Sequence, residues 1–281
     1  MKMSTNVLSF SPEGAETPNL GEFIIHHLQD SHEWNLFGYH VHLPTFEPVY
    51  LFGIKFDLSI TLHVVTMWFA GLFLVTVLGR LYRKPQLVPR GLAALVESIV
   101  LFVRDEIAVP NLGARYGKVF TPFLSTLFLF ILTLNLMGLI PIFATATGNI
   151  SVTASLALIT FAMMNVYGIK ENGFIGFYKN MVPHSVPFLM IPLLFFIEIL
   201  GLFTKSFALA MRLFANMIAG HAVIFAFLGL IIVLGTVLVS VFAVPFAVFI
   251  HFLELLVAFI QAYIFTMLTS LFVGMAMHPE H

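Results

Sequence analysis

The sequence contains no cysteine and very little charge, and both absences narrow what the protein can be. Only 10% of its 281 residues are charged, against about 25% in an average soluble protein. Without cysteine the chain has no disulfide, no thiolate metal site and no cysteine nucleophile. The 13 basic and 14 acidic residues nearly cancel, so no charge excess is available to capture nucleic acid. Because 59% of the residues are hydrophobic, the composition predicts an all-α integral membrane protein.

Two sequence signals are also missing. There is no glycine-rich phosphate loop with Lys and Ser or Thr, so we expect no ATP site in the chain itself. Residues 1–18 hold one lysine and no apolar run, which favours a bacterial membrane protein inserted by its own spans rather than by a signal peptide. The N-terminal histidines lack tight ligand spacing, so we predict no cofactor and no metal, and interpret these histidines as surface residues: His26, His27, His32, His40 and His42.

The N-terminal part divides into a polar tail and a first span. Residues 1–55 hold six acidic side chains but only two lysines. Residues 58–79 then carry no formal charge, and about 20 apolar residues suffice to cross the hydrocarbon. Basic residues follow the span at once, at Arg80, Arg83, Lys84 and Arg90. Since basic loops stay in the cytoplasm, we expect residues 1–55 outside the cell and residues 56–281 as one membrane domain.

The middle of the chain predicts a surface helix followed by a hairpin of two spans. Between Leu92 and Val103 apolar residues recur at helical spacing, which is typical of an amphipathic helix lying on the cytoplasmic surface. Residues 119–169 contain no charged side chain, and Pro141 interrupts them. Two spans over about 119–141 and 150–169 with a tight outer turn fit this pattern.

The C-terminal part is apolar but contains ionisable residues. As single helices, segments 187–235 and 240–277 would be about 73 and 57 Å long, whereas the hydrocarbon core is about 30 Å thick. We therefore expect two strongly tilted or kinked helices and a cytoplasmic C-terminus. Intramembrane ions need protein or water beside them and are functional by default. The ionisable residues are Glu198, Lys205, Arg212, His221, His251 and Glu254.

The first long helix has a charged stripe. Glu198, Lys205 and Arg212 are seven residues apart, so they share one face, and Asn216 lies about 40° from it. His221 is about 180° round the helix from Arg212. Arginine keeps its proton, so Arg212 can act as a fixed charge but not as a relay.

The second long helix offers proton-carrying groups. Glu254 and Gln261 are again seven residues apart, and His251 precedes Glu254 by one turn. A carboxyl group and an imidazole can exchange protons near neutral pH. Facing helices with these groups favour a proton path; His251 itself is interpreted as a packed histidine.

These residues carry a family resemblance. Residues 210–221 (AMRLFANMIAGH) and 254–265 (ELLVAFIQAYIF) resemble subunit a of bacterial F-type ATP synthases. Residues 135–141 (NLMGLIP) with 149–153 (NISVT) are similar to the family's middle hairpin, and 23–28 (FIIHHL) to its N-terminal segment. The resemblance extends over about residues 20–278.

The resemblance implies a stator subunit in the bacterial inner membrane that packs against a rotating ring of c subunits. It further implies peripheral-stalk b subunits as partners, and no catalysis by the chain on its own. Arg212 would match the essential arginine between two offset half-channels. Asn216, His221, Glu254 and Gln261 would belong to the outer half-channel, with Glu198 and Lys205 toward the cytoplasmic exit. Gln261 could instead steady Arg212.

The sequence departs from the enterobacterial pattern at two places. In the enterobacterial form an acid stands at the position of His221 and a histidine at the position of Glu254. The interchange keeps one acid and one histidine, which supports contact between the two positions. Gly138 stands where an acid is frequent, which leaves Asn135 as the polar channel residue of that hairpin. Asn135, Asn216 and Gln261 could equally serve as hydrogen-bonded helix contacts.

The ionisable residues also fit other roles and other classes of membrane protein. Arg212 could form a structural ion pair with Glu198 or Glu254, and Lys205 could extend toward the membrane surface. A self-contained transporter would show internal repeats, which the sequence lacks. A haem-anchoring subunit would need paired histidines on facing spans. The choice between proton and sodium coupling does not follow from this chain.

Overall fold

The computed structural model shows a helical membrane protein. Five helices among the described residues are long and apolar enough to cross a membrane, which confirms the predicted all-α membrane class. The chain forms two compact units: a main unit, Asp30–Ile218 with Leu253–His281, and a small unit, Met1–Gln29 with Ala219–Phe252. The structure describes residues 33–36, 39–45, 49–51, 54–56, 59–83, 89–140, 142–179, 187–234 and 237–278. The resembling segment 23–28, His26, His27 and His32 lie outside the described residues.

Two short β-hairpins precede the first long helix. β1 (Glu33–Leu36) pairs antiparallel with β2 (Tyr39–His42), and β3 (Val49–Leu51) pairs with β4 (Ile54–Phe56). In both hairpins the two residues between the strands have the sequence Phe-Gly. The sequence interpretation treated this region only as a polar tail, so the hairpins are an addition to it.

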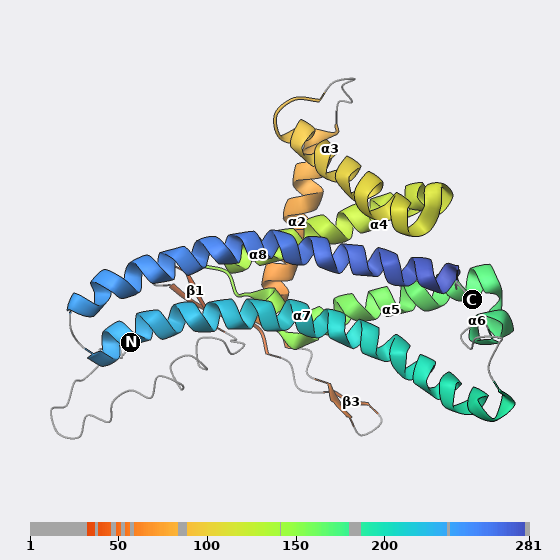
Figure 1. Ribbon diagram of the computed structural model, residues 1–281. Coiled ribbons are helices and arrows are strands. Elements are labelled where there is room, and N and C mark those ends of the chain that lie inside the picture. Colours follow the sequence, from red (N-terminus) through yellow and green to blue (C-terminus); the bar gives the residue numbers. More distant parts are fainter. Residues whose placement is uncertain are drawn as a thin grey trace. The chain divides into compact units, whose positions relative to one another are not determined.

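The first long helix, α2 (Leu62–Leu81), covers most of the predicted span 58–79 (Figure 1). Only 17% of the most apolar stretch of 18 residues in α2 is buried. Ala70 is fully buried against Leu134 and Met137, while Leu72 is 66% exposed. The helix therefore contacts the rest of the main unit along one narrow face.

The predicted surface helix is joined to the second span through a π-helical turn and a kink. α3 (Leu92–Phe102) leads through a π-helical turn, η1 (Val103–Ala108), into α4 (Val109–Gly138). The sequence placed the second span at about 119–141, because the charge-free run begins there. The actual break is Gly113, whose φ of 75° and ψ of 167° reverse the chain.

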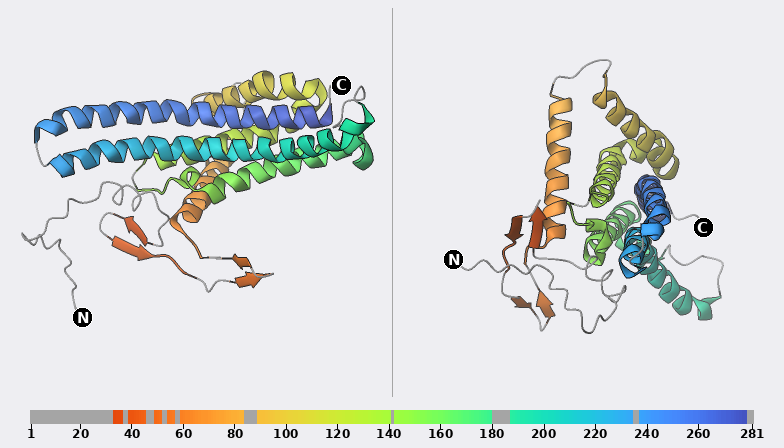
Figure 2. Two further views of the ribbon diagram at one scale, coloured as in Figure 1. Left: turned by 60° about the horizontal axis from the view of Figure 1, so that its bottom comes forward. Right: turned by 90° about the vertical axis from the view of Figure 1, so that its left-hand side faces the viewer.

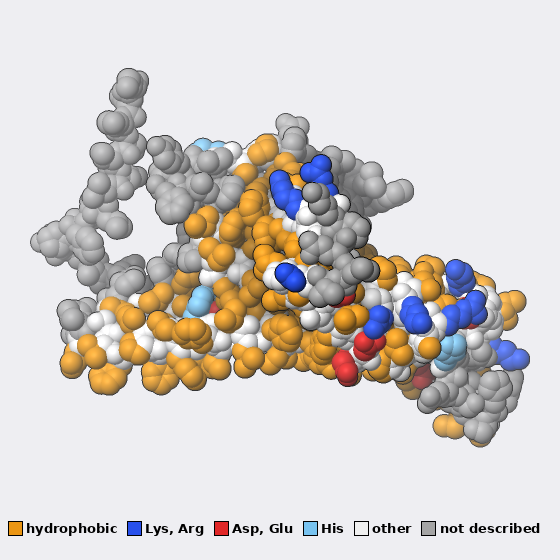
Figure 3. All heavy atoms as spheres, turned by 90° about the horizontal axis from the view of Figure 1, so that it is seen from above, with side chains coloured by type: hydrophobic (Ala, Val, Ile, Leu, Met, Phe, Trp, Pro, Cys, Tyr) orange, Lys and Arg blue, Asp and Glu red, His pale blue; other side chains and the backbone are white. Residues whose placement is uncertain are grey.

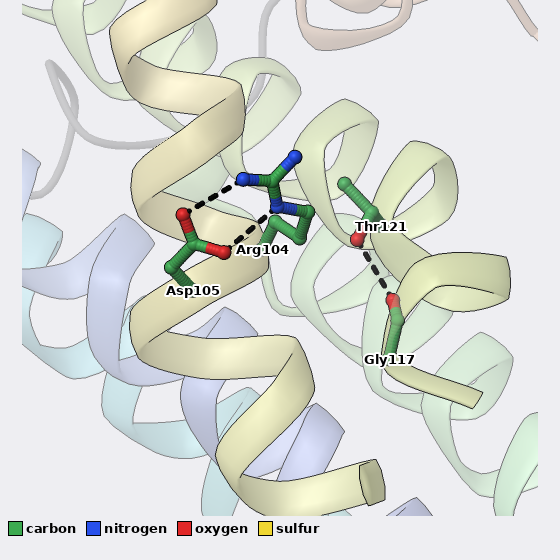
Figure 4. A network of polar contacts seen from close by, with 4 residues as sticks. All are labelled: Arg104, Asp105, Gly117 and Thr121. Carbon is green, nitrogen blue, oxygen red and sulfur yellow. Dashed lines mark hydrogen bonds and ion pairs between the residues drawn. The ribbon is translucent and has the colours of Figure 1, made fainter. Parts of the chain in front are cut away.

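Glycine also makes the reversal compact. A Cβ at Gly117 would lie 2.8 Å from the Cα of Val109, so only glycine lets the two arms approach this closely. Thr121 donates a hydrogen bond of 2.7 Å to the Gly117 carbonyl. On the preceding arm, in η1, Arg104 forms two hydrogen bonds with its neighbour Asp105, of 2.7 and 3.0 Å (Figure 4).

The second hairpin arm is α5 (Ile150–Asn172), which follows the short turn η2 (Ala146–Gly148) and precedes α6 (Phe174–Lys179). Asn149 caps α5 by accepting a hydrogen bond of 2.8 Å from the Ser151 amide, which satisfies one free donor of the first turn. α5 covers the predicted span 150–169.

Two long helices complete the chain, α7 (Ile191–Leu234), which follows the short turn η3 (Phe188–Met190), and α8 (Val237–Met277). In the main unit α7 and α8 run side by side (Figure 2). The described part of the small unit is the end of α7 with the start of α8, where Phe227 and Phe246 stack with ring centroids 5.4 Å apart.

The core of the main unit lies between α4, α5 and α8. Phe128, Ile131 and Phe265 are fully buried there, and Leu213 of α7 is 1% exposed. The most apolar stretch of 18 residues differs in burial between the two segments. In the α3–α4 segment 56% of that stretch is buried, whereas in α7 only 11% is buried. α4 is thus a core element, whereas α7 presents most of its surface outward.

Candidate functional site

Arg212 lies at the middle of α7. It is 21 residues from Ile191 and 22 from Leu234, or about 32 Å from either end. Its side chain is exposed. In the part of the chain that the structure describes, Arg212 forms no ion pair with Glu198 or Glu254. The structural ion pair considered from the sequence is therefore not present within this chain, and the guanidinium is available to a group from elsewhere.

Asn216, one turn after Arg212, is tied to α8. Its side-chain amide donates a hydrogen bond of 2.7 Å to the Oε1 atom of Gln261, whose side chain is only 2% exposed. Gln261 was also considered as a support for Arg212. Its hydrogen-bond partner among the described residues is Asn216, so any support that it gives to Arg212 acts through the α7 backbone.

A second contact fixes the alignment of the same two helices. The Lys205 ammonium lies 6.0 Å from the ring centroid of Phe272. Eleven residues separate Lys205 from Asn216, and eleven separate Gln261 from Phe272. The helices are therefore antiparallel and aligned over about 16 Å, and Arg212 lies between the two contacts.

Asn135 extends the polar contacts to a third helix. Its side-chain amide, 1% exposed, donates a hydrogen bond of 3.2 Å to the carbonyl of Ala258 on α8. Ala258 precedes Gln261 by one turn. A line of amides thus crosses from α4 through α8 to α7. We name the three residues Asn135, Gln261 and Asn216 the amide line.

Two atoms of the amide line have no hydrogen-bond partner among the described residues. They are the Oδ1 atom of Asn135 and the Nε2 atom of Gln261, both fully buried. An unsatisfied buried polar atom costs about 1–3 kcal/mol. These two atoms are therefore the unsatisfied points of the amide line among the described residues.

Glu254 belongs to the inward face of α8. It precedes Ala258 by four residues and Gln261 by seven, so the three share one stripe. Glu254 is 8% exposed, and Ala258 is 3% exposed. The stripe therefore carries a carboxyl group and an amide on its buried face, with a small residue between them.

The remaining predicted residues are placed as follows. Glu198 and Lys205 lie half-buried on α7. His221 belongs to the small unit, where its ring centroid is 6.4 Å from that of Phe225; its pairing with Glu254 stays a prediction. His251, interpreted as a packed histidine, is instead exposed on α8.

Gly138 is explained by packing rather than by proton transfer. A Cβ at this position would lie 2.8 Å from the terminal methyl group of Met217 and 3.1 Å from a side-chain carbon of Thr145. A larger side chain here therefore requires the Met217 methyl group to move aside and Thr145 to give by a few tenths of an ångström. This close approach is a reason for glycine that the sequence alone does not reveal.

Sequence reasoning missed several buried hydroxyl groups close to the site. Thr160 of α5 and Thr269 of α8 share a hydrogen bond of 3.0 Å, and Ser206, next to Lys205, has a buried Oγ without a partner among the described residues. Ser and Thr in apolar helices commonly bond to their own backbone, so their type alone gave no signal.

The arrangement suits ion movement. A fixed cation, buried amides and a buried carboxyl group lie on three neighbouring helices. Among the described residues no group of three His, Asp or Glu side chains is placed to hold a metal ion. These features define a polytopic helical membrane protein with a polar site inside its apolar region.

Comparison with known proteins assigns this protein to a family. Residues 64–274 match the family model of the ATP synthase A chain. ATP synthase subunit a of Anaeromyxobacter dehalogenans is 48% identical over 93% of this chain and 72% of its own length. The corresponding subunit of Myxococcus xanthus is 51% identical over 80% of this chain and 75% of its own length. That of Chloroherpeton thalassium is 47% identical over 92% of this chain and 77% of its own length. The chain belongs to the ATP synthase subunit a family, whose members are membrane-sector subunits of that complex.

The amide line leads to a test by a double-mutant cycle. Because Asn216 and Gln261 share one bond, either N216A or Q261L alone is expected to slow ATP-driven proton pumping by about two- to tenfold, the range for a lost hydrogen bond. The double variant should be no slower than the slower single variant. Pumping by S155A, which removes an exposed hydroxyl bonded to its own helix, should be unchanged. Multiplied losses in the double variant would show that the bond does not connect the two residues in the working complex.

Proposed function

We propose that the chain is the stator subunit that delivers protons to, and removes them from, a rotating ring of c subunits. The single observation that carries the proposal is Arg212, an exposed arginine at the centre of a long apolar helix without an ion pair in the described chain. A charge in the bilayer needs a partner or water. Carboxyl groups of a neighbouring ring would supply that partner.

The surface around Arg212 supports a large neighbour. On the exposed face of α7, Phe203 is 58% and Phe207 64% exposed, and Ala208 and Ala215 are exposed too. Small residues beside the arginine let another helix approach closely. A ring carboxyl that is neutral in lipid would ionise beside Arg212 and become neutral again after leaving it.

Two half-channels would then meet at Arg212 from opposite sides. We assign Asn216, His221, Glu254 and Gln261 to the path from the outside, with the amide line as its inner wall. Glu198 and Lys205 are assigned to the cytoplasmic exit. Asn135 is assigned to the wall through its bond to Ala258.

The fixed charge prevents a direct passage between the two paths. Protons entering on one side must therefore travel with the ring before they leave on the other. Each proton that crosses a potential of 100 mV releases about 2.3 kcal/mol, and this energy would drive rotation and ATP synthesis. In this role the chain performs no bond chemistry itself and resides in the bacterial inner membrane, together with b subunits of the peripheral stalk. The N-terminus would lie outside and the C-terminus in the cytoplasm.

Cysteine cross-linking tests which face of α7 meets the ring. The chain has no native cysteine, so an introduced thiol is its only one. A215C places that thiol on the exposed face beside Arg212, and A210C places it on the buried face, where Ala210 is 4% exposed. With a second cysteine next to the ring carboxyl, A215C should form a disulfide with the c subunit and A210C should not. Equal cross-linking, or cross-linking by A210C alone, would contradict the proposal.

A further inference from the structure

A cavity of about 780 Å³ lies between α2, α3 and α4, away from Arg212 and the amide line. Its volume falls in the range of ligand pockets, about 300–1,000 Å³. Most of its wall is aliphatic, with Leu78 of α2, Val96 and Val100 of α3, and Leu129 of α4. The assigned site uses none of these residues, so the cavity needs a separate explanation.

Basic residues surround one end of this cavity. Arg90 lines it, and the exposed Arg80 and Arg83 flank the lining residues Leu81 and Tyr82. One acid, Glu97, also lines the wall. The chain that forms this wall and its immediate neighbours in sequence thus carries three arginines and one glutamate, although only Arg90 and Glu97 line the cavity itself. Figure 3, which views the molecule from above in Figure 1, shows Lys and Arg side chains beside an apolar surface.

The closed side of the cavity holds an unused polar group. Ser125 is 4% exposed and lines the cavity, and its Oγ atom has no hydrogen-bond partner among the described residues. The neighbouring hydroxyls of Thr121 and Thr126 both donate to carbonyls of their own helix. Ser125 therefore differs from them in having a buried hydroxyl without a partner among the described residues, behind the wall of the cavity.

From the aliphatic wall and the arginines beside it we infer that the cavity binds an anionic glycerophospholipid, with an acyl chain against the wall and the phosphate beside Arg90. Basic pockets between membrane helices on the cytoplasmic side bind acidic lipid headgroups. The inference does not depend on the proton path, because no residue of the cavity belongs to it.

Photolabelling of the assembled complex tests the inference. The complex is reconstituted into vesicles that contain phosphatidylglycerol with a diazirine on its acyl chain, or the matching phosphatidylcholine probe. The phosphatidylglycerol probe should label peptides from residues 89–101 and 121–129 more strongly. R90Q should reduce this preference by about fivefold, the factor expected for one arginine beside an anionic headgroup.

A variant that fills the cavity provides the second arm. A93W should abolish labelling by both probes, and A93L should reduce it if the tryptophan variant does not assemble. The matched controls are L72W, on an exposed face of α2 outside the cavity, and K118Q, an exposed cation that does not line it. Both controls should label like the parent complex.

Three outcomes would overturn the inference. They are equal labelling by the two probes, labelling that persists in A93W, and absence of label because a helix of another subunit is cross-linked at these peptides. None of them bears on proton pumping, which is measured in the same vesicles. Failure of the lipid site and failure of the proposed function are therefore distinguishable.

Discussion

Replacing Arg212 with alanine is expected to abolish ATP-driven proton pumping in a complex that still assembles. The side chain is exposed and has no ion pair in the described chain, so its removal leaves no buried partner unsatisfied. The loss would fall on the charge that draws each ring carboxyl into its ionised form. Removing one electrostatic contact from a site of low dielectric constant commonly lowers a rate by about 100- to 1,000-fold. Acidification of inverted vesicles, with an immunoblot for assembly, measures the effect.

A matched arginine variant separates this effect from a general loss of charge. Arg115 is exposed near the N-terminal end of α4, where its guanidinium lies 5.7 Å from the ring centroid of Tyr116. R115A should pump at the parent rate. Pumping by R212A at the parent rate would remove Arg212 from the transport step, and the stator proposal would lose the observation that carries it.

Replacing Gly274 with valine is expected to prevent stable assembly. A Cβ at Gly274 would lie 2.2 Å from the carbonyl oxygen of Asn111 and 3.2 Å from its carbon. Because the obstacle is backbone, no side-chain rotation relieves it. One turn earlier, Ser270 donates a hydrogen bond of 3.2 Å to the Ile107 carbonyl. α8 thus packs directly on the backbone of η1 and α4, and valine would force them apart.

The size of this effect is set by overpacking. Added carbons in a packed core cost about 1–3 kcal/mol and occasionally more, and a backbone clash belongs at the upper end of this range. The amount of the chain in washed membranes, measured by immunoblot, should fall strongly in G274V. G79V is the control, because a Cβ at Gly79 would meet nothing within 4 Å. A normal level of G274V would mean that α8 does not pack on Asn111 in the complex.

The sequence predicted the long helices well because apolar length and charge are physical requirements of the bilayer. It was less successful where backbone geometry decides. The charge-free run predicted a span beginning at about residue 119, and it could not show that α4 starts at Val109 and contains a kink at Gly113 before that run. The sequence signal for this break was Gly113 itself, because glycine adopts positive φ readily.

The N-terminal hairpins were missed for another reason. Their strands are three or four residues long, which is too short for a clear alternating pattern. A signal was nevertheless present, because the dipeptide Phe-Gly occurs twice between short runs rich in aromatic and β-branched residues. Glycine in a two-residue connection is typical of β-hairpins.

In the candidate site, the sequence predicted which residues share a face of one helix, but it could not predict which residues touch between helices. The heptad spacing placed Glu254 and Gln261 on one stripe, and both are buried. The sequence could not show that Asn216 bonds to Gln261 or that Asn135 reaches the Ala258 carbonyl. For these amides the structure supports the interpretation as hydrogen-bonded helix contacts, and a role in proton transfer stays a prediction.

Passive proton flow tests most directly whether Arg212 separates two half-channels. Inverted vesicles are stripped of the ATP-hydrolysing sector, a potential is imposed, and proton entry is followed with a pH-sensitive dye. The proposal predicts that R212A vesicles conduct protons at least as fast as parent vesicles, because the barrier between the paths has been removed while both paths remain. Flow in R212A vesicles as slow as in vesicles without the complex, at a normal level of assembly, would make Arg212 a part of the conducting path and contradict its role as the separating charge.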